Sequence, residues 1–103
     1  MNLHIIMNVI SYKALRNFYA IHSDSKSYLS AWFKTVKKAK WKNINELKID
    51  YPSADLISDN RFIFNIKGNH YRLIARINFG HQRVMIKWLG THADYDKINA
   101  DTI

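Results

Sequence analysis

The chain contains no cysteine, one proline and three glycines among its 103 residues. Without cysteine, disulfides and cysteine-ligated zinc sites are excluded, and this composition is typical of proteins of the reducing cytoplasm. The scarcity of proline and glycine leaves no linker or low-complexity segment. We therefore expect one domain over residues 1–103. Because 48% of the residues are hydrophobic, the composition indicates a packed globular fold and not a disordered chain.

Long hydrophobic runs are also missing. No apolar segment approaches the roughly 20 residues that a membrane-spanning helix needs. The segment LHIIMNVI, residues 3–10, has no basic residue before it and no small-residue cleavage site after it. It therefore predicts a strand and not a signal peptide.

Acidic residues are absent from residues 61–92, in a chain whose net charge is +8. This segment carries six Lys or Arg residues and three histidines. Such a local positive field favours a polyanionic partner such as nucleic acid. The alternative is a generically basic protein with no such partner.

The first half of the chain shows helical patterning. Ser11 can cap a helix over residues 11–22, and the SDS segment at residues 23–25 can cap a second helix. Apolar residues recur at helical spacing in both segments: Tyr12, Leu15, Phe18 and Tyr19, then Tyr28, Leu29, Trp32, Phe33 and Val36. We expect a helical hairpin whose apolar side packs on a sheet.

Three strands are expected after a connector that ends in a turn at Asp59-Asn60: residues 61–67, 71–79 and 83–89. Gly68-Asn69 and Gly80-His81 predict two-residue hairpin turns between them. The predicted pairs are Arg61–Arg76, Asn65–Arg72, Arg72–Leu89, Ile74–Lys87, Arg76–Met85 and Asn78–Arg83. This register places the alternating apolar residues, Trp88 among them, on one face of the sheet.

The other face, which we call the basic face, gathers Arg61, Lys67, Arg72, Arg76, Arg83 and Lys87. Like charges directly opposite each other destabilise a sheet. We therefore expect this face to be unpaired within the chain and to bind an anionic partner.

A short helix is expected after the last strand, because Thr91 and Asp94 form a capping box. His92 and Tyr95 then lie three residues apart, side by side on this helix, at the rim of the basic face. The five histidines share no metal-ligand spacing, and the acid-free strands offer no carboxylates, so we expect no metal and no cofactor.

Arginine, histidine and tyrosine together suit the metal-independent cleavage of RNA. In that reaction the 2′-hydroxyl attacks phosphorus and gives a 2′,3′-cyclic phosphate and a 5′-hydroxyl. Arginine binds phosphate with its planar fork, and histidine can act as acid or base near neutral pH. The residues equally permit simple RNA binding, in which His92 is a surface residue and Tyr95 packs on the sheet.

Two segments, IFNIKGNHYRLIARI and LGTHADYDKI, resemble the HigB-type toxins of the RelE/ParE superfamily of bacterial toxin–antitoxin systems. The segment SYKALRNFYAIHSDSKSYLSAWFKTVKKAKWKN and the short YPSAD are similar to that family as well, so the resemblance covers nearly the whole chain. It implies an α+β, RelE-like fold: an N-terminal strand and a helical hairpin on a curved antiparallel sheet, with a short C-terminal helix.

The same resemblance implies an mRNA endoribonuclease that blocks translation, often on the ribosome, and a cognate HigA-like helix-turn-helix antitoxin. On this chain it implies a phosphate-binding and catalytic role for Arg72 and catalytic roles for His92 and Tyr95. Lys67 matches the family's lysines only loosely. With Arg61, Arg76 and Lys87 we expect it to bind RNA.

Two alternatives remain open on the same fold. One is an RNA-binding module without catalysis. The other is a gyrase poison of the ParE type, since fold alone does not decide function.

Overall fold

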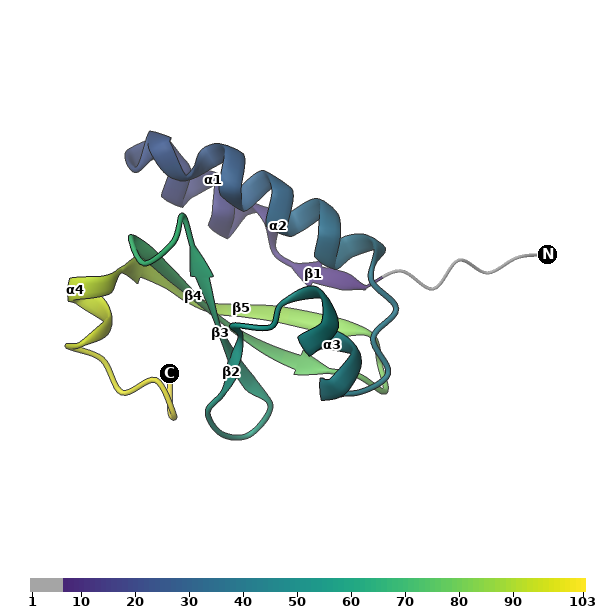
Figure 1. The fold of residues 1–103 in the computed structure, drawn as a ribbon. Helices are drawn as coiled ribbons and strands as arrows, with labels where there is room; N and C mark the ends of the chain where they lie inside the picture. Colours follow the sequence, from purple (N-terminus) through teal and green to yellow (C-terminus); the bar gives the residue numbers. More distant parts are fainter. Residues whose placement is uncertain (1–6) are drawn as a thin grey trace.

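The computed structural model describes residues 7–103 as a five-stranded sheet with a helical hairpin on one face (Figure 1). The elements are β1 (Asn8–Ile10), α1 (Tyr12–Ile21), a 3₁₀ turn (Ser23–Ser25), α2 (Lys26–Lys38), α3 (Ile44–Asp50), β2 (Asp55–Leu56), β3 (Arg61–Ile66), β4 (Tyr71–Asn78), β5 (Arg83–Thr91) and α4 (His92–Tyr95). This architecture confirms the predicted α+β class. None of the described helices is long and apolar enough to cross a membrane.

The helical hairpin packs as its apolar spacing predicts. Leu15 of α1 and Leu29 and Val36 of α2 are fully buried in one core cluster with the apolar face of the sheet. Ser11 stands at the N-cap of α1, although its side chain makes no capping hydrogen bond. The prediction for Tyr28 is wrong: its side chain is 48% exposed, because it lies at the edge of the stripe that α2 buries.

The sheet has the strand order β1-β5-β4-β3-β2. All neighbouring pairs are antiparallel except β1 and β5, which run parallel. The long connection that these two parallel strands need runs from β1 through α1, α2 and α3 and then through the strands β2, β3 and β4. The predicted strand over residues 3–10 is confirmed for Asn8–Ile10, and residues 1–6 lie outside the described part of the chain.

The β3–β4 hairpin has the predicted register, with Arg61 opposite Arg76 and Asn65 opposite Arg72. Gly68 has a φ of +62°, which glycine adopts without strain. The Asp59-Asn60 turn joins β2 to β3, and both of its residues have positive φ, as this type of tight hairpin turn requires.

The β4–β5 pairing is as predicted only over its first half. Asn78 pairs with Arg83 and Arg76 with Met85, but Ile74 then pairs with Trp88 and Arg72 with Gly90. The predicted pairs Ile74–Lys87 and Arg72–Leu89 are therefore wrong. A β-bulge opposite Ile74 and Ala75 inserts one extra residue, Lys87, into β5. Because side chains alternate between the two faces of a sheet, one inserted residue moves every later side chain of the strand to the other face.

The bulge moves Trp88 to the other face of the sheet. Cross-strand partners share a face, so Trp88 lies with Ile74 and Arg72 on the basic face, opposite α1 and α2. Leu89, paired with Leu73, takes the core side in its place. The prediction that Trp88 belongs to the core face is therefore wrong.

Candidate active site

Arg72 lies in the middle of the basic face, on β4. Its guanidinium carbon is 4.5 Å from the centroid of the Tyr95 ring, a cation–π contact that fixes the side chain. Its Nε is buried and has no hydrogen-bond partner among the described residues. None of the ion pairs in the described part of the chain includes Arg72. Its charge is thus held in place without being neutralised.

Tyr95 reaches Arg72 because α4 begins directly at the end of β5. One of the two hydrogen bonds of the predicted capping box is found: the Asp94 main-chain N–H donates to Thr91 Oγ1 over 3.1 Å. The His92 N–H donates to the carbonyl oxygen of His70, over 3.2 Å, which ties the start of α4 to the β3–β4 hairpin. The helix is short, but His92 at its start and Tyr95 at its end both contact residues of the β3–β4 hairpin.

Trp88 is the site residue that the sequence reasoning missed. Its ring centroid lies 6.0 Å from that of Tyr95. Its indole also lies over Gly90, since a Cβ built on Gly90 would stand only 2.5 Å from Trp88 Cζ2. The one signal in the sequence is the glycine inside a strand, which marks bulges and close approaches.

His92 occupies the first turn of α4, three residues before Tyr95, as predicted. Its side chain is half-buried, and the hydrogen bond found for His92 within residues 7–103 is the one from its main-chain N–H, not from its imidazole. The structure thus places His92 on the same short helix as Tyr95.

Two arginines of the basic face are paired, which contradicts the expectation of an unpaired face. Asp59, in the β2–β3 turn, accepts from Arg61 over 3.2 Å and from Arg76 over 3.1 Å. Arg61 also donates to the carbonyl oxygen of Ile103, and its side chain is only 11% exposed. Arg76 is 45% exposed and remains accessible. The carboxylate comes from just outside the acid-free segment, so the strand pattern alone gave no sign of it.

Lys67 is paired as well. Asp24, in the 3₁₀ turn before α2, accepts from Lys67 Nζ over 2.8 Å and from the Tyr71 hydroxyl over 2.5 Å. The hydrogen bonds from Lys67 and Tyr71 lower the pKa of Asp24, and the same contacts raise the pKa of Lys67 and of Tyr71. This cluster fastens the helical hairpin to the β3–β4 hairpin.

The remaining predicted cations are Lys87, the extra residue of the bulge, and Arg83, which is exposed at the start of β5. Neither takes part in an ion pair within residues 7–103. Over the same residues, no three His, Asp or Glu side chains come together in a group that could hold a metal ion.

Comparison with known proteins gives one consistent result. The model of the HigB toxin family, described as the RelE-like toxic component of a toxin–antitoxin system, matches residues 25–98. An mRNA interferase toxin HigB from Escherichia coli K12 is 32% identical over 96 residues, which are 91% of this chain and 92% of that protein. An mRNA interferase HigB from Shigella flexneri matches to the same extent. A third relative, the mRNA interferase HigB of Escherichia coli O6:H1, is 24% identical over 89% of this chain.

We predict that Gly90→Ala destabilises the protein through Trp88. The new Cβ would overlap the indole, so Trp88 must move, at a cost of about 1–3 kcal/mol in the free energy of unfolding measured in urea. Gly80→Ala is the matched control, because its nearest atom would lie at an ordinary 3.5 Å. In a Trp88→Ala background the penalty should vanish. An equal effect of both glycine substitutions would contradict the overlap.

We also predict a pH-dependent contribution of Asp24 to stability. Because its pKa is lowered in the folded state, its contribution is present above the unfolded value of 3.8 and is lost as the pH falls through the folded value. Asp24→Asn should thus be less stable than the wild type at pH 7, with a difference that shrinks at about pH 3. Urea unfolding at both pH values measures this, with exposed Asp96→Asn as control. A difference independent of pH would refute the assignment.

Proposed function

Because the chain belongs to the HigB family of RelE-like toxins, we propose that it is the toxin of a toxin–antitoxin system and an endoribonuclease that inhibits translation by cleaving mRNA. The relatives named as mRNA interferases support this over nine-tenths of the chain. The observation that carries it is Arg72, fixed on Tyr95 in the middle of the basic face without a carboxylate partner.

In this proposal Arg72 binds the scissile phosphate. The 2′-oxygen forms a bond to phosphorus and the bond to the 5′-oxygen breaks, which gives a 2′,3′-cyclic phosphate and a 5′-hydroxyl. Negative charge on the five-coordinate phosphorus rises in the transition state, and a fixed guanidinium stabilises that charge. A charge already held in place need not be reorganised as the reaction proceeds.

His92 is our candidate for proton transfer. It takes the proton from the 2′-hydroxyl or gives one to the leaving 5′-oxygen, and its ring nitrogens have no partner to displace among the described residues. Tyr95 holds Arg72 through its ring and completes the catalytic group. The reaction requires no cofactor and no metal, because the RNA supplies its own nucleophile.

The other cations divide by their pairing. We propose that Arg76 and Lys87 bind the RNA backbone beside the cleavage site. Lys67 can add a contact at the rim, where its side chain is 30% exposed but held by Asp24. For Arg61, which is nearly buried between Asp59 and Ile103, we propose that its main role is to hold the turn.

Family membership implies an antitoxin partner, and we propose a HigA-like helix-turn-helix protein in this role. We further propose that the chain works as one RelE-like domain over residues 1–103, on mRNA at the ribosome in the cytoplasm. One core cluster, to which the helices α1, α2 and α3 and the sheet contribute, supports the one-domain proposal.

We predict that Arg72→Ala lowers the rate of RNA cleavage by roughly 10²- to 10³-fold, the usual loss when one charge-stabilising donor is removed. The assay maps cleaved ends of message in EDTA, with and without ribosomes, and those ends should be 5′-hydroxyls. Arg16→Ala, an exposed arginine on α1, makes the same change in charge away from the site.

The same assay separates the alternative functions. Binding without EDTA-resistant cleavage by the wild type would indicate a non-catalytic RNA-binding module and refute the enzyme. DNA breaks in expressing cells, with intact message, would indicate the gyrase poison instead.

We predict that expression of the wild-type chain arrests growth and that a co-expressed antitoxin encoded beside it restores growth. Arg72→Ala should be harmless when expressed alone and should still co-purify with the antitoxin, because Arg72 is needed for chemistry and not for folding. Growth arrest by Arg72→Ala at wild-type protein levels would contradict the catalytic role.

A further inference from the structure

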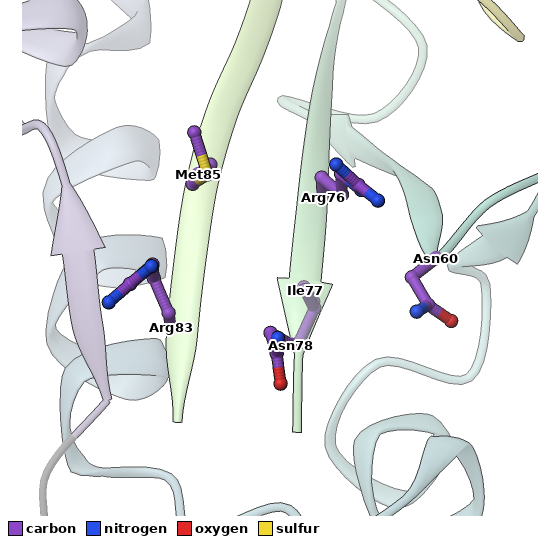
Figure 2. A pocket seen from close by; sticks show the side chains of 6 residues that line it. All are labelled: Asn60, Arg76, Ile77, Asn78, Arg83 and Met85. Carbon is purple, nitrogen blue, oxygen red and sulfur yellow. The ribbon is translucent and has the colours of Figure 1, made fainter. Parts of the chain in front are cut away.

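A polar pocket lies on the basic face, at the end of β4 away from Tyr95 and α4. It encloses about 170 Å³ and is lined by Asn60, Arg76, Ile77, Asn78, Arg83 and Met85 (Figure 2). These residues come from β4, β5 and the turn between β2 and β3. Figure 2 shows Arg83 on the β5 side of the pocket and Arg76 on the opposite side, directed toward Asn60.

The pocket offers hydrogen-bond donors and no lining carboxylate. Asn78 Oδ1 accepts from the His81 N–H over 3.0 Å, which directs the amide nitrogen of Asn78 away as a free donor. Arg83 is exposed and lies in none of the ion pairs found within residues 7–103. Asp59 lies beside the pocket, where it pairs with Arg76. Because this one carboxylate is shared by Arg61 and Arg76, the region keeps a net positive charge. Such a lining fits an anionic ligand rich in acceptors.

Met85 adds an apolar surface to this lining. Its side chain is 37% exposed and lies across from Arg76, two residues along β5 from Arg83. A flat base can lie on a methionine and an arginine while its phosphate is held by the second arginine. The pocket thus combines the features that a single nucleotide unit requires.

The spacing along β4 relates this pocket to the cleavage site. Arg72 and Arg76 lie on the same face four residues apart, about 13 Å at the rise of a strand. The residue of β4 between them on this face is Ile74, which is apolar and fully buried. A few nucleotides of one extended strand can reach from Arg72 to this pocket.

We propose that the pocket is a second RNA subsite, which binds the phosphate and base of a nucleotide a short distance along the strand from the scissile phosphate. This inference rests on the proposed function, because it takes Arg72 as the cleavage site. Arg83 is its central ligand, with Asn60 and Asn78 as donors to the base. The subsite sets how long an RNA must be to bind well.

The test is binding of 2′-O-methyl RNA, which lacks the nucleophile, to the full chain by fluorescence anisotropy. A trinucleotide and a nonanucleotide of mixed sequence serve as probes. The wild type should bind the nonanucleotide more tightly. Arg83→Ala should weaken nonanucleotide binding about tenfold, the usual scale for lost hydrogen bonds to a charged group, and leave trinucleotide binding nearly unchanged. The salt slope for the nonanucleotide should fall by about 0.7, the contribution of one phosphate contact.

Two further variants guard against misfolding and nonspecific charge effects. Asn60→Gly removes a donor and keeps the positive φ of the turn, so it should weaken only the nonanucleotide. Arg16→Ala makes the charge change of Arg83→Ala elsewhere. If Arg83→Ala behaves as Arg16→Ala does, or weakens both probes equally, the subsite is refuted. Wild-type protein that shows this pattern but cleaves no RNA would refute the proposed function and leave the subsite standing.

Discussion

One extra residue in β5 determines how the candidate site is built. Beyond the bulge at Lys87, the side chains of β5 point to the opposite faces from those that strict alternation predicts. Leu89 therefore enters the core, and Trp88 lies on the basic face over Gly90. β5 ends at Thr91, and α4 begins at the next residue. This short helix places the Tyr95 ring against the Arg72 guanidinium. Without the bulge, Trp88 would point toward α1 and α2. The bulge therefore links the packing of the core to the aromatic side chains around Arg72.

The second constraint is how positive charge is distributed over the basic face. Carboxylates from other elements hold three of the six cations: Asp59 contacts Arg61 and Arg76, and Asp24 contacts Lys67. These pairs lie at the margins of the sheet, where they fasten a turn and the helical hairpin. Arg72, in the middle, is held by an aromatic ring instead, so its charge is not neutralised by a carboxylate of the described residues. The ion pairs of this surface thus leave Arg72 without a carboxylate partner among the described residues.

The sequence allowed much of this arrangement to be predicted, because several of its determinants are local. Alternation and the Gly68 turn placed Arg61 opposite Arg76, and the capping box placed α4. The bulge could not be predicted from the alternation of apolar and polar residues in β5, since a single inserted residue leaves the alternation intact on either side of it. The pairing of Asp59 could not be read either, because it depends on how a turn folds back beside the strands. The errors concern contacts between elements that only the three-dimensional fold brings together.

The central claim, that RNA lies on the face of the sheet that the bulge has remodelled, can be tested with the three indole N–H signals of the protein. Trp32 and Trp41 are almost fully buried, at 3% and 2% exposure, and belong to the core on the other side of the sheet. In a nitrogen-15 NMR titration with 2′-O-methyl RNA, the account predicts that the Trp88 indole signal shifts while the Trp32 and Trp41 signals stay in place. Saturable RNA binding that leaves the Trp88 signal unmoved would contradict it.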